Sequence, residues 1–263
     1  MSDHRKARIA GRFGAAAVDY DAHSPLQRKA ALQLALRVQG LALPNAPRVL
    51  EIGCGTGHLT HALLPALGGR WLVSDIAPAM VDACRRNLGG SVVDYIVMDG
   101  ERPAIAAGCF DLIVASLAAQ WFVDLPAALA RLASLLAPGG RMALATLGAG
   151  TFAEWTEAHA AAGLTAATPA FPDAAALARA FPPGLEVEVN EERFVEPLAE
   201  PLEFVRGLRL IGADTPAPGT KPLSAGQLRR VLRALAAYRG IHYRLLYAIA
   251  RRSSSTSQPR TTR

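Results

Sequence analysis

A short apolar run, a glycine-rich turn and a helical segment follow one another between residues 48 and 67, and this succession constrains the fold most. The run Arg48–Ile52 is rich in Val, Leu and Ile, as buried strands are. The turn Gly53–Gly57 follows directly, and His58–Leu67 has the pattern of a helix that ends near Gly68. A strand that enters a helix through a glycine turn is typical of open α/β sheets, in which ligands bind at the carboxyl ends of the strands.

The alternation of strands and helices continues along the chain, which predicts a parallel sheet covered on both faces. Further strands are expected at 70–74, 92–98, 110–116, 141–147, 185–194 and 241–250. Further helices are expected at 25–39, 78–88, 151–162, 173–180, 200–211 and 224–237. Leu125, Leu129, Leu132 and Leu136 form a helical stripe that Pro138-Gly139-Gly140 stops. We therefore expect a doubly wound α/β fold: a mostly parallel, seven-stranded, Rossmann-like sheet with a helical insertion near the C-terminus.

One domain is expected over residues 1–252, since 51% of the 263 residues are apolar and can form a large core. Within it, residues 12–40 are predicted as an N-terminal lid helix and residues 198–238 as a helical insertion over the active site. Residues 253–263 are polar and low in complexity, so a disordered tail is expected there. The sequence has no twenty-residue apolar run and no secretory pattern, which favours a cytoplasmic protein without membrane contact.

The cysteines and histidines predict neither disulfides nor a metal site. Cys54, Cys84 and Cys109 are far apart and odd in number, as is usual for free thiols in a reducing compartment. His58 and His61 are three residues apart, but no Cys or carboxylate triad joins them.

The spacing of the glycines indicates the kind of ligand. They stand at 53, 55 and 57, and residue 58 is His, so the G-x-G-x-x-G pattern of pyrophosphate-binding turns is absent. The acidic Glu51 lies two residues before Gly53. A carboxylate there would repel a pyrophosphate, whereas it would tolerate a ligand with a cationic amino-acid end.

Two aspartates at strand ends complete the expected ligand site. Asp75 ends the second strand, where a carboxylate can accept hydrogen bonds from both ribose hydroxyls. Asp99 ends the third strand, is followed by Gly100, and can accept the exocyclic amine of an adenine. The ligand so described has an adenine, a free ribose and no obligatory phosphate.

These residues lie in segments that resemble a known family. VLEIGCGTG, MDGE, FDLIVASLAAQWF and LLAPGGRMAL resemble the strand regions of class I S-adenosylmethionine (SAM)-dependent methyltransferases over about residues 48–147. In that family the turn packs against the amino-acid part of SAM, and the two strand-end acids meet the ribose and the adenine. The resemblance implies SAM as co-substrate, and these cofactor-binding residues: Glu51, Gly53, Gly55, Gly57, Asp75, Ile76, Asp99, Gly100 and Ser116.

Four further segments are similar to a narrower family. FGAAAVDYDAHSPLQR, LAAQWFVDLPAAL, FVRGLRLIGADTPAPG and RGIHYRLLYAIARR resemble the malonyl-[acyl-carrier protein] O-methyltransferases of biotin synthesis. This resemblance spans about residues 12–252. It implies methyl transfer from SAM to the free carboxylate of a malonyl thioester on an acidic acyl carrier protein. The methyl ester masks the charge, so that fatty-acid elongation enzymes accept the chain.

A carboxylate acceptor needs positioning rather than a general base, because its ordinary pKa of about 4 keeps it ionised at neutral pH. The guanidinium group of Arg is suited to bind such an anion. Bidentate hydrogen bonding to both oxygens would lower the nucleophilicity of the carboxylate, so we expect contact with one oxygen only or contact through water. The expected residues at the reacting centre are Arg206 and Arg209 in the insertion, Tyr20 near the N-terminus, and Gln120 and Trp121 after the fourth strand. Tyr20 and His23 are expected to close over the SAM site as a lid.

Charge is distributed unevenly along the chain, whose net charge is +6. Residues 201–263 contain twelve Lys or Arg and two Asp or Glu. We expect this basic segment to dock the acidic carrier protein. Nucleic acid is the weaker expectation, because few aromatic residues interleave with the arginines and no nucleic-acid motif is present. The candidate docking residues are Arg229, Arg230, Arg233, Arg239 and Arg244.

Two other functions stay open from the sequence alone. One is a SAM-dependent methyltransferase for another small molecule, such as a free dicarboxylic acid or a quinone precursor. The other is a SAM-binding or carrier-binding protein without catalysis.

Overall fold

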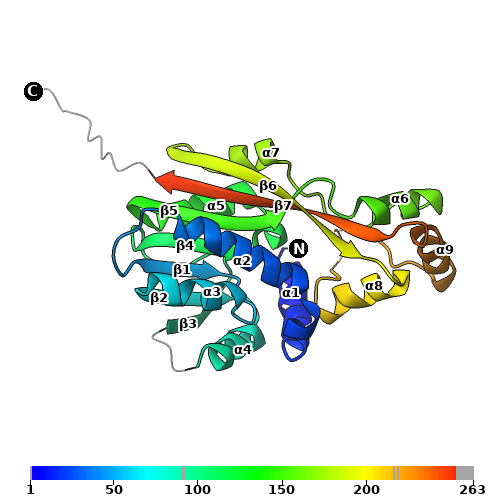
Figure 1. The fold of residues 1–263 in the computed structure, drawn as a ribbon, viewed down its shortest axis with the longest axis horizontal. Helices are drawn as coiled ribbons and strands as arrows, with labels where there is room; N and C mark the ends of the chain where they lie inside the picture. The colour runs from blue at the N-terminus through cyan, green and yellow to red at the C-terminus, as the bar shows by residue number, and fades with distance from the viewer. Residues whose placement is uncertain (1, 90–92, 216, 218, 253–263) are drawn as a thin grey trace, which may run out of the picture.

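One seven-stranded sheet organises the protein in the computed structural model, which describes residues 2–89, 93–215, 217 and 219–252. The strands lie in the order β3-β2-β1-β4-β5-β7-β6 (Figure 1). Their bounds are β1 Arg48–Ile52, β2 Arg70–Asp75, β3 Val93–Val97, β4 Phe110–Ser116, β5 Leu136–Leu147, β6 Leu185–Pro197 and β7 Gly240–Arg252. The first five strands pair in parallel, whereas β7 runs antiparallel between β5 and β6. The mostly parallel, Rossmann-like sheet predicted from the sequence is therefore confirmed.

Helices cover both faces of the sheet. Alternate side chains of each strand point to opposite faces, and because the strands are largely apolar, both faces must be covered. On one face lie α2 (Pro25–Gln39), α3 (His58–Leu67) and α4 (Pro78–Leu88), and on the other lie α5 (Leu125–Ser134) and α7 (Ala174–Ala180). Neighbouring residues of β4 show the division: Leu112 packs in the first core and Ile113 in the second.

The predicted lid over residues 12–40 is not one helix. It consists of the end of α1 (Ser2–Ala16), the 3₁₀ turn η1 (Tyr20–His23) and α2. The apolar side chains of α2 recur every fourth residue, and Leu34 and Val38 are fully buried against the sheet. The predicted cover over the edge of the sheet is therefore divided among α1, η1 and the start of α2, whose later turns pack in the core. The helical structure of residues 2–11 was not predicted from the sequence.

Leu136 is in a strand and not in the helical stripe where the sequence placed it. Helix α5 ends at Ser134, and β5 starts at Leu136, which pairs with Phe110 of β4. The register then shifts, so that Arg141 pairs with Leu112. Pro138-Gly139-Gly140 thus forms a bulge within β5 rather than a helix stop.

Three helices surround the C-terminal end of β6 and the N-terminal end of β7, away from the parallel strands (Figure 1). They are α6 (Ala153–Ala161), α8 (Pro201–Leu210) and α9 (Ala225–Leu235). The last two lie in the predicted insertion, residues 198–238. The predicted disordered tail, residues 253–263, lies outside the described residues.

Candidate active site

Two adjoining cavities open where the parallel strands end. The smaller, of about 100 Å³, lies over the ends of β1, β2, β3 and β4. The larger, of about 220 Å³, lies between η1, the start of α2, the end of β6 and α8. Four residues line both cavities and form the wall that they share: Phe13, Tyr20, Leu117 and Trp121. The smaller cavity is the predicted cofactor site.

The glycine turn borders the smaller cavity and depends on backbone conformations that favour glycine. Gly53, Gly55 and Gly57 have φ angles of 69°, 53° and 101°. A Cβ on Gly53 would lie 2.5 Å from the Cβ of Ala118, so the turn has no room for a side chain at this position. Gly53 and Gly55 line the cavity. Gly57 does not; it precedes α3, and a Cβ there would lie 3.1 Å from the sulfur of Cys84.

Asp75 joins the end of β2 to the glycine turn. Its Oδ2 accepts a hydrogen bond from the N–H of Gly55 at 3.0 Å, and its Oδ1 accepts one from the N–H of Ala77 at 2.8 Å. Burial raises the pKa of Asp75, and these two backbone hydrogen bonds oppose the rise. Because Asp75 and Ile76 line the cavity, the carboxylate is placed to accept further hydrogen bonds from a ligand.

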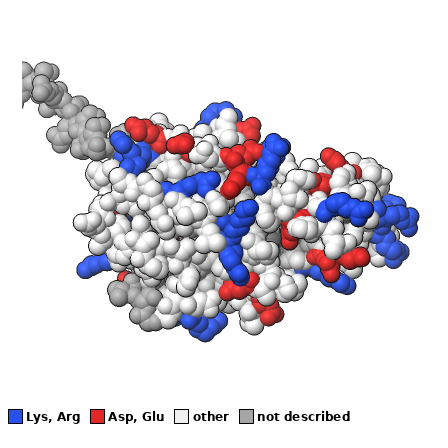
Figure 2. Space-filling view, viewed as in Figure 1, with Lys and Arg blue, Asp and Glu red and all other residues white. Residues whose placement is uncertain are grey.

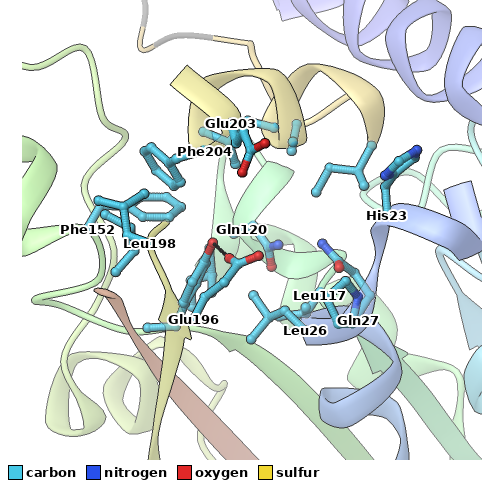
Figure 3. A pocket seen from close by; sticks show the side chains of 18 of the residues that line it. His23, Leu26, Gln27, Leu117, Gln120, Phe152, Glu196, Leu198, Glu203 and Phe204 are labelled. Carbon is cyan, nitrogen blue, oxygen red and sulfur yellow. Dashed lines mark hydrogen bonds between the residues drawn. The ribbon is translucent and has the colours of Figure 1, made fainter. Parts of the chain in front are cut away.

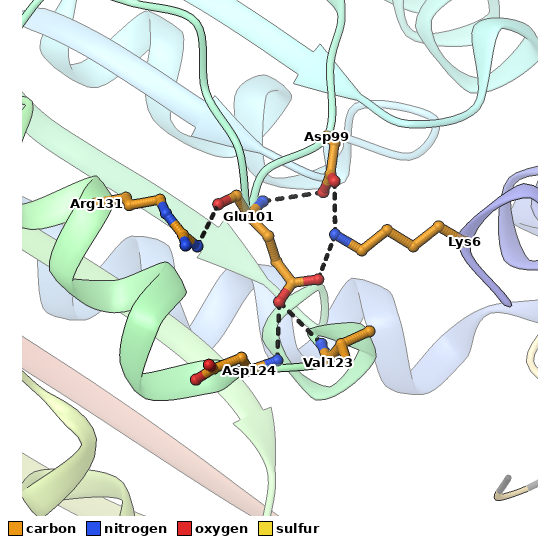
Figure 4. Close-up of polar contacts among 6 residues, drawn as sticks. All are labelled: Lys6, Asp99, Glu101, Val123, Asp124 and Arg131. Atoms are coloured by element: carbon orange, nitrogen blue, oxygen red, sulfur yellow. Dashed lines mark hydrogen bonds and ion pairs between the residues drawn. The ribbon is translucent and has the colours of Figure 1, made fainter. Parts of the chain in front are cut away.

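Asp99, just after β3, forms an ion pair with a lysine that no sequence motif indicated. The Nζ of Lys6, on α1, donates to Asp99 Oδ2 at 2.5 Å and also contacts Glu101 (Figure 4). The other oxygen of Glu101 accepts hydrogen bonds at 2.9 Å from the N–H groups of Val123 and Asp124. Lys6 thereby ties α1 to the edge of the cavity where the adenine was expected, and it competes with a ligand for Asp99.

Glu51 is buried under the turn and does not line either cavity. Its Oε2 accepts a hydrogen bond from the hydroxyl of Thr60 at 2.6 Å. Burial raises the pKa of Glu51 to about 8, an effect that the Thr60 hydrogen bond opposes and the charge of Asp75 reinforces. Direct contact between Glu51 and the ligand therefore stays a prediction, while the structure places this carboxyl against α3.

Substitution of Glu51 by Gln is expected to flatten the pH dependence of stability. The pKa of this group is about 8 in the folded state and 4.5 ordinarily, so folding favours the protonated form. The unfolded chain loses this proton above about pH 4.5, and the free energy of unfolding then falls until about pH 8. Gln keeps the shape and the acceptor for Thr60 but cannot ionise.

Urea unfolding measures this effect at about pH 5 and about pH 9. We expect the wild type to lose at least about 1.4 kcal/mol more than Glu51→Gln between these values, the equivalent of one pKa unit. Equal losses in the two proteins would contradict the buried, protonated state of Glu51.

The turn η1 is fastened to the glycine turn by a polar cluster around Asp21. Asp21 Oδ1 accepts a hydrogen bond from the hydroxyl of Thr56 at 2.5 Å and lies 3.3 Å from His58 Nε2. Asn87 donates to the carbonyl oxygen of Thr56 at 3.0 Å and to Asp21 Oδ2 at 3.4 Å. This cluster places Tyr20, the neighbour of Asp21, in the wall between the two cavities.

The larger cavity contains three of the residues expected at the reacting centre, Tyr20, Gln120 and Trp121, and also His23, which was expected in a lid over the SAM site. Gln120 projects into it from the 3₁₀ turn η2 (Ala119–Trp121) that follows β4 (Figure 3). The hydroxyl of buried Thr146 donates to Gln120 Oε1 at 3.4 Å, which leaves the amide NH₂ group of Gln120 available to a substrate.

Arg206 and Arg209 do not line this cavity, and their predicted contact with the substrate carboxylate stays a prediction. Phe204, Gly207 and Leu208 of α8 line the cavity, with Phe204 buried, whereas both arginines are exposed. The Arg209 side chain is 66% exposed, and its Nε lies 3.8 Å from Asp214 Oδ2. Their spacing put them on one face, but the apolar residues of α8 decide which face is buried.

Within the described ranges, no His, Cys, Asp and Glu side chains are grouped so as to hold a metal ion. In the same part of the chain, no helix is long and apolar enough to cross a membrane.

The polar groups of the smaller cavity suit SAM. Ser116 lines it, and the buried Ser116 hydroxyl has no hydrogen-bond partner among the described residues. Gly100 also lines it, in a place where a Cβ would lie 2.3 Å from a methyl group of Ile52. Together, Asp75, Asp99 and Ser116 provide polar groups at the ends of three neighbouring strands, and the packing against Ile52 requires glycine at position 100. Of the nine predicted cofactor-binding residues, all but Glu51 and Gly57 line this cavity.

Comparisons with known proteins identify the family of the chain. A family profile described as a methyltransferase domain matches residues 49–140. The malonyl-[acyl-carrier protein] O-methyltransferase of Magnetococcus marinus is 39% identical over 259 residues, which cover 95% of this chain and 94% of that protein. The biotin biosynthesis bifunctional protein BioCD of Bordetella avium is 50% identical over 226 residues, covering 86% of this chain but only 48% of that protein. The chain thus spans about half the length of this bifunctional relative.

A solved structure shares the fold at low identity. The YcgJ protein of Bacillus subtilis superposes with a TM-score of 0.61 at 16% identity, over 86% of this chain and 99% of that one. The fold, the glycine turn and the strand-end aspartates, with the methyltransferase profile, define a class I SAM-dependent methyltransferase. Within this class, the chain belongs to the malonyl-[acyl-carrier protein] O-methyltransferase family.

Proposed function

We propose that this enzyme transfers a methyl group from SAM to the free carboxylate of a malonyl thioester carried by acyl carrier protein, and that the methyl ester serves biotin synthesis. The observation that carries the proposal is similarity over nearly the whole of both chains to a protein named for this reaction. The two adjoining cavities support it, because a methyl donor and an acyl acceptor must meet at one wall.

The residues of the chain provide positioning rather than proton transfer. When bound, SAM supplies a methyl group on a positively charged sulfur. Asp75 and the glycine turn hold the donor, while Phe13, Tyr20 and Trp121 exclude water from the shared wall. Burial and the charges of Asp75 and Asp21 raise the pKa of Tyr20, so its hydroxyl stays protonated and can donate a hydrogen bond.

We propose that uncharged hydrogen-bond donors bind the substrate carboxylate. Gln120 offers its NH₂ group to one carboxylate oxygen, since Thr146 already occupies its carbonyl oxygen. Other uncharged donors in the lining include the side chains of Tyr20, Gln27 and Trp121. A single neutral hydrogen bond leaves the second oxygen nucleophilic, whereas a bidentate Arg contact would spread its charge.

We further propose that the acidic carrier protein docks on α9. Arg229, Arg230, Arg233 and Arg239 are exposed, and no carboxylate among the described residues lies within salt-bridge distance of them. Figure 2 shows Lys and Arg side chains gathered at the end of the molecule where α9 lies in Figure 1. Exposed cations of this kind steer an acidic partner and raise its association rate. Arg244 does not belong to this surface, because its Nη1 binds Glu191 Oε1 at 2.6 Å.

The proposal is tested by mass spectrometry of acyl carrier protein after incubation with the purified enzyme and SAM. We expect the malonyl form to gain the mass of one methyl group and the acetyl form, which has no free carboxylate, to gain nothing. No gain on the malonyl form, with SAM binding intact by calorimetry, would overturn the proposal.

A further inference from the structure

The larger cavity has an unusual charge for a site that receives an anion. Three carboxylates line it: Glu196 at the end of β6, Glu200 before α8, and Glu203 within α8. Its lining, drawn from the described residues, includes neither Lys nor Arg, and His23 is the one basic side chain there. Figure 3 shows Glu196 and Glu203 pointing toward the same space as Gln120.

Glu196 is held in a fixed orientation. The hydroxyl of buried Tyr243 donates to Glu196 Oε2 at 2.6 Å. Burial and the neighbouring carboxylate raise the pKa of Tyr243, so this hydroxyl remains a donor. The other oxygen of Glu196 is then free to accept a hydrogen bond from an occupant of the cavity.

Thr215 adds an independent sign that the cavity receives a polar ligand. It lines the cavity, is 4% exposed, and its buried hydroxyl has no hydrogen-bond partner among the described residues. Buried polar groups are almost always hydrogen-bonded, so an unpaired hydroxyl in a cavity wall indicates a missing partner.

Aromatic rings form part of the apolar wall of the cavity. Phe152 packs edge-on against Phe204 and Tyr243, with ring centroids 5.5 Å and 5.1 Å apart, and Phe171 lies beside it. Apolar walls with a few acceptors suit a flexible, uncharged chain that carries amide N–H groups. The thioester arm of an acyl carrier protein is such a chain next to the sulfur.

We infer that the part of this cavity lined by Glu196, Glu200, Glu203 and Thr215 is a subsite for the neutral, amide-bearing thioester arm, and that its carboxylates reject acceptors with a second negative charge. The inference rests on the proposed function. The substrate then brings one carboxylate, which lies at the wall shared with the methyl donor. A free dicarboxylate would place its second charge toward the three glutamates, which disfavours it.

Two malonyl thioesters of similar size test the inference without the carrier protein. One has an N-acetylcysteamine arm, which ends in a neutral amide; the other has a 3-mercaptopropionate arm, which ends in a carboxylate. We expect the wild type to favour the amide arm in kcat/KM by at least about tenfold, equivalent to about 1.4 kcal/mol. We expect the double variant Glu196→Gln, Glu203→Gln to bring this ratio at least fivefold closer to one.

A control and a second variant separate the subsite from general charge and folding effects. Glu188→Gln removes a negative charge from the same strand as Glu196, outside the cavity, and the ratio should stay at the wild-type value. Thr215→Val should raise KM for the amide-arm thioester by about threefold or more, without lowering the melting temperature, because it removes an unpaired buried hydroxyl.

The outcomes distinguish the inference from the function on which it rests. If malonyl-acyl carrier protein is not methylated, the proposed function fails and the inference fails with it. If the carrier substrate is methylated but the two short thioesters react equally, or neither reacts, or the double variant keeps the wild-type ratio, only the subsite is overturned.

Discussion

Replacement of Asp75 by Ala is expected to weaken SAM binding by at least about 100-fold. The carboxylate lines the cofactor cavity at the end of β2, where it can accept both ribose hydroxyls. Hydrogen bonds to a charged group contribute about 1.5–3 kcal/mol each, and each 1.4 kcal/mol changes affinity about tenfold. The same substitution removes the acceptors of the Gly55 and Ala77 N–H groups, which loosens the turn as well.

Isothermal titration calorimetry measures this affinity, and thermal unfolding reports whether each variant is folded. Asp94→Ala is the matched control, because Asp94 is exposed on the neighbouring strand β3 and does not line the cavity. We expect wild-type affinity for this control. A folded Asp75→Ala variant with wild-type affinity would remove Asp75 from the cofactor site.

The Gly53→Ala variant is expected to lose both stability and SAM binding. A Cβ at this position lies 2.5 Å from the Cβ of Ala118, and the φ angle of 69° strains any L residue. Positive φ costs about 1–2 kcal/mol for a non-glycine residue, and overpacking adds about 1–3 kcal/mol. We therefore expect the free energy of unfolding to fall by about 2–5 kcal/mol, with the turn displaced from the cavity.

The Gly139→Ala variant separates backbone strain from the steric clash. Gly139 has a φ angle of 77°, but nothing lies within 4 Å of a Cβ built there. We expect this variant to lose about 1–2 kcal/mol of unfolding free energy from backbone strain alone, and to bind SAM normally. Denaturant titration and calorimetry measure both quantities. Equal destabilisation of the two variants would argue against the close contact between Gly53 and Ala118.

Local signals made much of the fold predictable. The apolar run that became β1 and the glycines that end it lie within ten residues, so no distant contact is needed to recognise them. The β-branched and aromatic residues near the C-terminus likewise predicted strand β7. Leu136 was assigned wrongly, because an apolar residue at helical spacing also fits a strand, and only the pairing with Phe110 decides between them.

The part of the site that could not be predicted from the sequence depends on contacts between distant segments. Lys6 meets Asp99 across 93 residues, and nothing in the charged N-terminal stretch indicates which carboxylate it will find. Arg206 and Arg209 share a helix face by spacing, but spacing cannot say that Phe204 and Leu208 take the cavity side. The apolar wall of the larger cavity likewise combines the end of β6, α8 and residues around Phe152, whose proximity arises only in the folded sheet.

The position of the transferred methyl group tests the central claim most directly. Malonyl-acyl carrier protein is incubated with the enzyme and methyl-labelled SAM, hydroxylamine then cleaves the thioester, and the released acyl hydroxamate is identified by chromatography with mass detection against standards. The account predicts the labelled methyl ester of malonyl hydroxamate. Unlabelled malonyl hydroxamate, or the isomer with the methyl group on the central carbon, would contradict it.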